Sequence, residues 1–314
     1  MSIKDDVRRW RVSPAARALV FVLLAVLVFY GLVLFAQFNS RDDAFVDHGF
    51  RLWAAMAAFS FTVWIALLGR GIAAIRAFPT SWQRGRSWWL ASLATYAVLM
   101  LAATTLIRGV TRGNSFEVPI RHFPALISVL TAAGAAAAAP WVLSVWLAQE
   151  RAQKLAEQGT SEDGAADFPA IAVTDVVAVW RVIERSGLAL SLIVSTSTFN
   201  TGALRLALIG SDAIEPDDFP PVFVLGYGAF FAAVLVAILL PLVLTWRTRA
   251  FALVEQELPA PGPGLLSEDL LAARARMEAQ LHVDVRFLRN PMAILSVLSP
   301  FATALITTLV PNGG

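Results

Sequence analysis

The chain has 314 residues, of which 57% are hydrophobic and only 15% are charged, and its mean hydropathy is +0.65. This composition lies outside the range of ordinary soluble domains and predicts an integral membrane protein. The chain has no cysteine, which excludes disulfides, thiolate nucleophiles and thiolate metal ligands. The net charge of +2 points neither toward nor away from nucleic acid, and we predict no nucleic-acid partner.

Seven apolar blocks, all free of Asp, Glu, Lys, Arg and His, occupy much of the sequence. Each is about as long as the ~20 residues that a helix needs to cross a hydrocarbon core of ~30 Å. The segments between them reach at most about 45 residues, too few for a soluble domain with a good core of its own. We therefore predict one all-α transmembrane domain over residues 1–314, a polytopic helix bundle with about seven spans in the lipid bilayer. The blocks are 18–37, 52–69, 88–107, 123–148, 187–204, 221–246 and 291–310.

The charges that flank the blocks predict the orientation, because cytosolic loops are enriched in Lys and Arg. Five basic residues precede the first block, which is longer than the apolar part of a cleaved signal peptide, so we expect a retained anchor and a cytosolic N-terminus. Loop 70–87 has four Arg and no acid and is predicted inside, whereas the acidic loops 38–51 and 205–220 are predicted outside. Loop 108–121 fits this pattern poorly. The Ala-rich blocks and the preference for Arg over Lys indicate a bacterial inner membrane.

Paired acids, Asp42 and Asp43, follow the first block. They resemble the outer-loop acidic motif of membrane glycosyltransferases that use lipid-phosphate sugar donors, where such acids serve metal or acid/base roles. The resemblance covers a handful of residues, and these enzymes usually have more spans and a much longer first loop. An enzyme of this kind is a minor alternative, and a solvated acidic loop is the ordinary interpretation.

Two cytosolic elements interrupt the series of blocks. The first, 149–186, contains a polar and acidic stretch at 150–170 that predicts a flexible linker. It is followed by a helix that Thr174 or Asp175 would cap and that would run unbroken into the fifth block.

The second cytosolic element, 247–290, contains the breaker PAPGPG and then a helix that Ser267 would cap. Apolar residues repeat on one face of this helix at helical spacing. The helix over 265–290 would lie on the bilayer or on its own bundle, or it would bind a soluble partner. The apolar face consists of Leu270, Met277, Leu281 and Leu288.

The fifth block is unusual, because seven hydrogen-bonding side chains lie within eleven of its residues. A polar stripe that extends beyond the block repeats at intervals of three or four residues and so lies on one side of a helix. It is either a packing seam, in which hydroxyls hydrogen-bond between helices, or the lining of a pore. The stripe consists of Arg181, Glu184, Leu188, Ser191, Ser195, Thr198, Gly202 and Arg205.

The seventh block has Pro300 at its centre, which predicts a kinked span, with a re-entrant segment as the alternative. Ser296, Ser299 and Thr303 in this block also repeat at intervals of three or four residues. They are the second set of candidate pore-lining residues.

The blocks lack the acidic, Lys and His side chains of proton relays and ion-coupled transporters, and we predict no cofactor and no metal. The leading hypothesis is a channel-like, pore-forming homo-oligomer, lined by the fifth and seventh blocks and constricted at Leu188. The alternative is a membrane-anchored signalling or assembly subunit whose cytosolic helices bind a soluble partner. An enzyme is the less favoured class.

Overall fold

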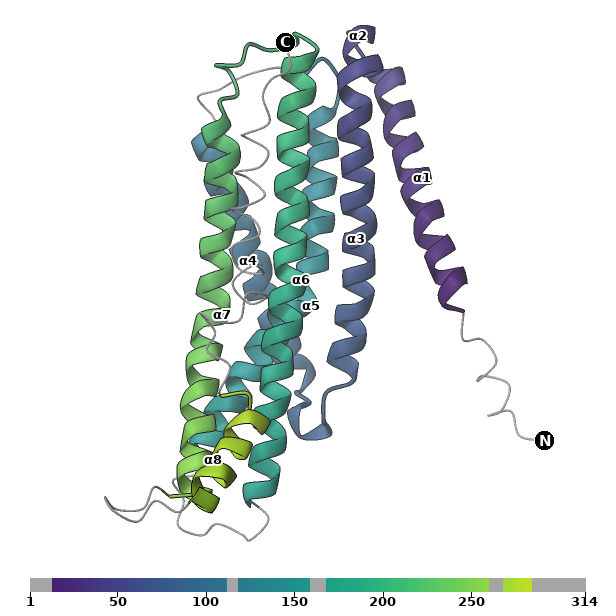
Figure 1. The fold of residues 1–314 in the computed structure, drawn as a ribbon. Coiled ribbons are helices and arrows are strands. Elements are labelled where there is room, and N and C mark those ends of the chain that lie inside the picture. Colours follow the sequence, from purple (N-terminus) through teal and green to yellow (C-terminus); the bar gives the residue numbers. More distant parts are fainter. Residues whose placement is uncertain (1–12, 112–117, 159–167, 260–267, 284–314) are drawn as a thin grey trace, which may run out of the picture.

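The computed structural model of the chain describes residues 13–111, 118–158, 168–259 and 268–283. In these ranges the regular elements are helices and no strand forms, which confirms the all-α prediction (Figure 1). The elements are α1 (Pro14–Asn39), α2 (Asp43–Phe45), η2 (Val46–Phe50), α3 (Arg51–Arg76), η3 (Thr80–Trp82), α4 (Arg86–Thr111), α5 (Phe123–Gln158), α6 (Phe168–Gly210), α7 (Pro221–Glu257) and α8 (Glu268–Gln280).

Five helices, α1, α3, α4, α5 and α7, are long and apolar enough to cross a membrane, so the chain has the character of a multi-pass membrane protein. They contain the first four blocks and the sixth. The fifth block lies in α6, which is not among the five; its hydroxyl-bearing residues lower the hydropathy of that helix. The seventh block lies outside the described residues. The count of seven spans and the orientation therefore stay predictions.

Helices α5 and α6 both extend further into the segment 149–186 than the sequence indicates. The predicted linker over 150–170 is helical at its start, because α5 continues to Gln158. Ala152 and Leu155 are buried there, so packing extends the helix. The C-terminal end of the predicted linker is also helical, because α6 begins at Phe168, ahead of the expected cap at Thr174 or Asp175. As expected, one unbroken helix then carries the chain into the fifth block.

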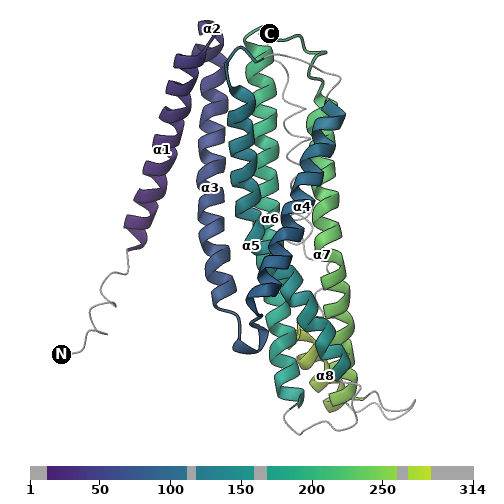
Figure 2. The ribbon, with the colours of Figure 1, turned by 180° about the vertical axis from the view of Figure 1, so that it is seen from behind.

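Helix α1 joins the bundle at one end only. Both ribbon views show it beside α3 near α2 and leaning away toward its N-terminus (Figures 1 and 2). Leu32 and Ala36, near its C-terminus, are buried, whereas Leu23 and Leu27 are exposed. Two backbone hydrogen bonds fasten this end to the segment before α5: Arg41 N–H donates to Pro119, and Arg121 N–H donates to Asn39.

The entry into α3 contains one turn of π-helix, η2, between α2 and α3. Gly49 lies in this turn and touches the backbone of α6. A Cβ atom placed on Gly49 would lie 2.3 Å from the carbonyl oxygen of Ala207. The close approach of η2 to α6 thus requires glycine at this position.

Helices α5, α6 and α7 are much longer than a membrane is thick. They have 36, 43 and 37 residues, and at 1.5 Å per residue they span about 54, 65 and 56 Å, against a hydrocarbon core of ~30 Å. Figure 1 shows them extending together beyond the η3 loop, toward α8. We call residues 149–158, 168–186 and 247–257 with α8 the stalk. All charged residues of α5 and α7 lie in the stalk.

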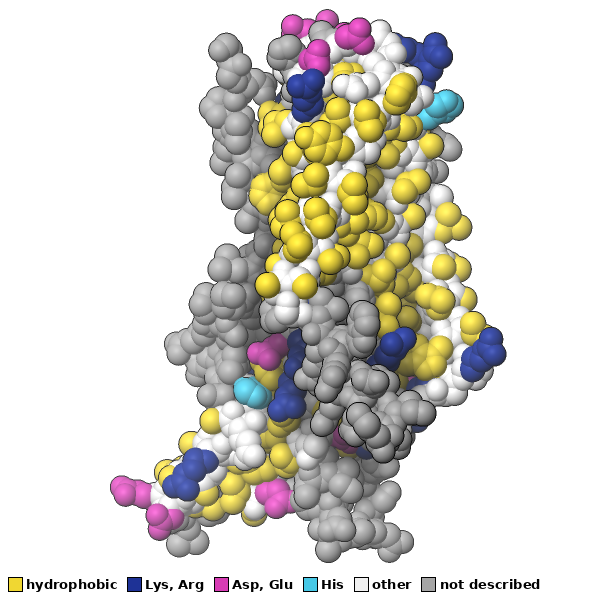
Figure 3. Space-filling view, turned by 90° about the vertical axis from the view of Figure 1, so that its right-hand side faces the viewer, with side chains coloured by type: hydrophobic (Ala, Val, Ile, Leu, Met, Phe, Trp, Pro, Cys, Tyr) yellow, Lys and Arg dark blue, Asp and Glu magenta, His cyan; other side chains and the backbone are white. Residues whose placement is uncertain are grey.

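The hydrophobic side chains form two clusters. The larger one joins α1, α3, α5, α6 and α7 at the end of the bundle that carries α2. The second, which we call the stalk core, lies where α5, α6 and α7 continue toward α8. Figure 3 shows a broad apolar surface over the upper part of the molecule, with charged side chains at the upper end and others spread over the lower half. The stalk core includes Trp82, Ala148, Leu155, Val179, Trp180, Leu242, Trp246, Val254 and Leu281.

Candidate functional sites

The predicted polar stripe on α6 divides into two environments. Ser191, Ser195, Thr198 and Arg205 are buried. Leu188 is 59% exposed, and the two stripe residues before it in the chain, both in the stalk, are exposed as well. The stripe therefore does not line one continuous interior surface of this chain. Ser296, Ser299 and Thr303, its expected partners, lie outside the described residues.

Most hydroxyls of the fifth block donate to their own helix. Thr196, Ser197, Thr198 and Thr201 each donate to the carbonyl four residues earlier, at 2.8–3.0 Å. Such bonds satisfy a hydroxyl within the helix, so its burial needs no water. This bonding is typical of a packing seam.

One hydroxyl also joins two helices. The indole Nε1–H of Trp64 on α3 donates to Thr196 Oγ1 at 2.9 Å. Ser60 Oγ on α3 donates to the Thr196 carbonyl at 3.2 Å. All three residues are buried. Polar contacts of this kind fix the register of two helices that have no strong hydrophobic preference for each other in lipid.

Arg205 ends the stripe with a structural contact. Its Nε–H donates to the carbonyl oxygen of Phe219 at 2.7 Å, and its side chain is buried. Phe219 lies two residues before the start of α7, so this bond fixes the α6–α7 connection.

The stalk contains a buried ion pair that sequence reasoning missed. Asp175, expected as a helix cap, is 4% exposed. Its Oδ1 accepts from Trp82 Nε1 at 2.9 Å, and its Oδ2 accepts from Arg151 Nε at 2.9 Å and from Arg151 Nη2. One carboxylate thus joins η3, α5 and α6. The spacing of these residues in the sequence gives no signal of this contact.

Helix α8 packs on the other helices of the stalk through its last turn and the residues that follow it. Leu281 is fully buried, Met277 packs against the stalk core, and His282 stacks on Trp180 with ring centroids 5.6 Å apart. Met277 and Leu281 of the predicted apolar face therefore pack against the chain's own bundle, and Leu270 is half-buried. Leu288 lies outside the described residues.

A second contact fixes α8 to the end of α7. Arg274 Nη2 donates to Glu255 Oε2 at 2.7 Å, and Arg274 Nη1 donates to the carbonyl of Leu258. The hydrogen bond from the Arg274 guanidinium to the Glu255 carboxylate raises the pKa of Arg274.

Polar atoms in the stalk core include several without a hydrogen-bond partner. The indole nitrogens of Trp180 and Trp246 are buried and unpartnered in the described structure, although their rings pack with centroids 4.6 Å apart. The Ser186 hydroxyl and Gln149 Oε1 are likewise buried without a partner. Gln149 Nε2 donates to Thr245 Oγ1 at 3.1 Å.

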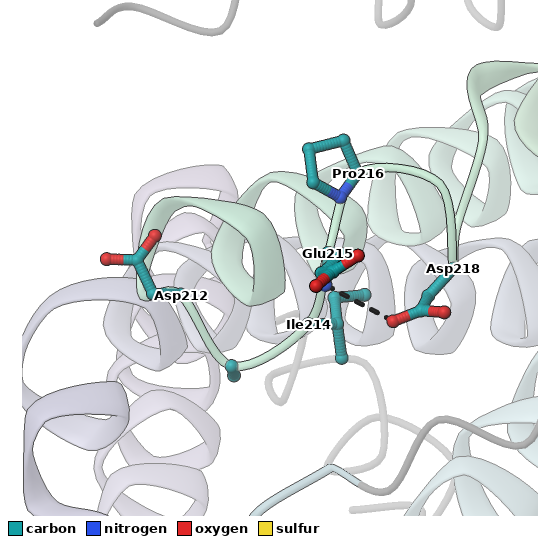
Figure 4. A pocket seen from close by; sticks show the side chains of 6 residues that line it. Asp212, Ile214, Glu215, Pro216 and Asp218 are labelled. Atoms are coloured by element: carbon teal, nitrogen blue, oxygen red, sulfur yellow. Dashed lines mark hydrogen bonds between the residues drawn. The ribbon is translucent and has the colours of Figure 1, made fainter.

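At the opposite end of the bundle, the α6–α7 connection forms an open pocket of about 600 Å³ (Figure 4). Asp212, Glu215 and Asp218 line it, and the backbone N–H of Glu215 donates to Asp218 Oδ2 at 3.2 Å. Figure 4 shows the Asp212 carboxylate pointing away from the other two acids. Within the described ranges, no group of acidic or His residues is arranged to hold a metal ion.

The paired acids Asp42 and Asp43 have local contacts. The N–H of Asp42 donates to Ser40 Oγ at 2.9 Å, and Asp43 begins α2, where an acidic side chain is favourable. They are not gathered with further acids in the described structure. These contacts are typical of a turn that starts a helix.

Comparisons of the chain with protein-family models, with curated proteins and with solved structures gave no match.

Proposed function

We propose that this chain is a membrane-anchored assembly subunit that presents the stalk to a soluble cytosolic partner. The observation that carries the proposal is the stalk core. Loops that only connect spans need no core of their own, whereas here three helices continue past the membrane thickness and pack around buried tryptophans. A rigid projection of this kind holds a binding surface at a fixed distance from the bilayer.

Contacts within the stalk support this rigidity. The buried Asp175 carboxylate ties three elements together. At the surface, Arg84 pairs with Glu150 at 2.7 Å and so joins the η3–α4 connection to α5. The surface offered to a partner is thus already ordered before binding, which lowers the entropic cost of binding.

The partner would contact the polar surface of the stalk. The apolar face of α8 is already covered at Met277 and Leu281, so a partner at 265–290 would use the other side of that helix. Arg181 and Arg185 on α6 and Arg247 on α7 are exposed. Arg181 and Arg185 lie one turn apart on α6, with the exposed Glu184 between them in the chain. Acidic side chains on the partner would pair with these two arginines, because charge complementarity speeds association and rejects wrong partners.

The experiment is purification of the tagged full-length protein from native membranes in mild detergent. We expect a soluble protein in stoichiometric amount, and its loss from an Arg181→Glu, Arg185→Glu double variant. Arg121→Glu, an exposed charge reversal at the other end of the bundle, is the matched control and should retain the partner. Purification of the unchanged protein without a stoichiometric partner would sink the proposal.

A second proposal is the channel-like homo-oligomer, and the exposure of Leu188 favours one form of it. Leu188 and, before it, Arg181 and Glu184 face outward on α6. An oligomer with this face toward its axis would place Leu188 at a constriction. Leu188→Ser should then raise ion leak through liposomes, whereas Leu99→Ser, on an exposed face of α4, should not. Equal leak from both variants would refute this arrangement.

A further inference from the structure

The connection between α3 and α4 carries positive charge that the described residues do not neutralise. Segment 70–87 contains four arginines and no acidic residue. One of them, Arg84, pairs with Glu150 of α5 at 2.7 Å. The other three form no ion pair with a described residue and are exposed; they are Arg70, Arg76 and Arg86. These guanidinium groups can accept an anion from outside the chain.

The ion pair with Glu150 places this connection at the edge of the apolar part of the bundle, because Glu150 is the first charged residue of α5. Trp88 and Trp89 lie at the same edge, at the start of α4. They are half-buried, and their rings meet edge to face with centroids 4.9 Å apart. Tryptophan is enriched where a membrane meets water. The last residue of α3 and the first of α4, Arg76 and Arg86, therefore lie at the level of lipid headgroups.

Helix α4 exposes an apolar face directly beyond Arg86. The helix lies on the outside of the bundle against α5 (Figure 2), where the Tyr96 hydroxyl donates to the Ala135 carbonyl at 2.7 Å. Leu90 and Leu93 are 58% and 48% exposed. They follow Arg86 by four and seven residues, so the three side chains share one face of the helix. A lipid whose acyl chain lies on these leucines would have its headgroup at Arg86.

We propose that the α3–α4 connection binds anionic phospholipids. Arg86 holds the phosphate of a lipid whose acyl chain lies on the exposed face of α4, and Arg76 adds to the charge that selects an anionic headgroup. The guanidinium group suits this ligand, because its fork of N–H donors matches the oxygens of a phosphate. An acidic soluble protein could pair with the arginines but could not reach the leucines beyond them in the bilayer. Both arginines lie outside the stalk, so this inference is independent of the partner proposed there.

The test places a fluorophore beside this face of α4, which the absence of native cysteine allows. Ala94→Cys, at an exposed position eight residues after Arg86, carries a bimane label in the full-length protein. The protein is reconstituted in phosphatidylcholine vesicles in which a small fraction of the lipid is dibrominated, as either phosphatidylcholine or phosphatidylglycerol. Bromine quenches the label only at short range. Excess quenching by the brominated phosphatidylglycerol therefore measures the enrichment of anionic lipid beside α4.

We expect brominated phosphatidylglycerol to quench the label at least about two-fold more than brominated phosphatidylcholine, because arginines near a membrane surface attract anionic lipids. The double variant Arg76→Gln, Arg86→Gln should abolish this excess. The control variant Arg121→Gln, Arg276→Gln removes two exposed charges elsewhere and should leave the excess unchanged. Equal quenching of the unchanged background by the two lipids would overturn the proposal, and so would an excess that survives the loss of Arg76 and Arg86.

A second label position tests whether any exposed arginine would have the same effect. Val129 is 62% exposed on α5 and follows Arg121 by eight residues, the spacing of Ala94 from Arg86. A label on Val129→Cys should show a smaller excess of quenching by brominated phosphatidylglycerol. An equal excess at both positions would indicate a general attraction of the lipid to exposed arginines and would refute a site at α4.

Discussion

The buried ion pair of the stalk makes the sharpest stability prediction. Asp175→Ala removes the only acceptor that the described structure gives to both Trp82 Nε1 and Arg151 Nε. The Arg151 side chain is 13% exposed and would lose its carboxylate partner. Removing one partner of a buried pair costs about 3–5 kcal/mol, because the remaining charge is left uncompensated. We therefore expect Asp175→Ala to lower the unfolding free energy by about that amount.

The measurement is unfolding in detergent micelles, followed by circular dichroism. A double variant, Asp175→Leu with Arg151→Met, separates the ion pair from packing, because replacing both charges by apolar side chains is often close to neutral. It should therefore recover most of the lost stability. A loss below about 1 kcal/mol for Asp175→Ala, or a double variant as unstable as the sum of the single ones, would refute the reasoning.

Three further substitutions test other contacts by the same unfolding assay or by hydrogen exchange. Gly49→Ala should cost about 1–3 kcal/mol, because the new Cβ would meet the Ala207 carbonyl; Gly31→Ala, with open space around it, should be harmless. Trp64→Phe should cost about 1 kcal/mol through the lost indole hydrogen bond to α6, and a neutral result would mean that this bond contributes nothing. Leu281→Ala should weaken the packing of α8 on the bundle by about 2–5 kcal/mol and so accelerate amide hydrogen exchange in α8. Unchanged amide exchange would show that Leu281 does not hold α8 on the bundle.

The spans could be predicted from the sequence because the bilayer demands long apolar runs, and α1, α3, α4, α5 and α7 satisfy that demand. The unbroken course of α6 also followed from the absence of breakers. In the stalk, the start of α6 and the helix after Ser267 were expected, whereas the continuation of α5 to Gln158 was not. Its evidence is tertiary, because Ala152 and Leu155 are buried among neighbours distant in the sequence.

For single residues of the polar stripe, too, burial could not be predicted from the sequence. Helical periodicity placed Leu188 and Ser191 on one side of α6, as the helix requires. Periodicity could not show that Ser191 is buried while Leu188 is exposed. The burial of each residue depends on which neighbouring helices lie beside that turn of α6. Asp175 is a comparable case: its residue type favoured a helix cap, but Trp82 and Arg151 made it a buried acceptor.

The bridge between Ser40 and Ile120 has a consequence for synthesis of the protein. The first helix gains this anchor only from residues 119–121, which are translated after α3 and α4. During insertion α1 must therefore wait in the bilayer without these two backbone hydrogen bonds. In a nascent chain that has left the ribosome only as far as residue 110, α1 would lack both of these hydrogen bonds. They could form once residues 119–121 had also left the ribosome.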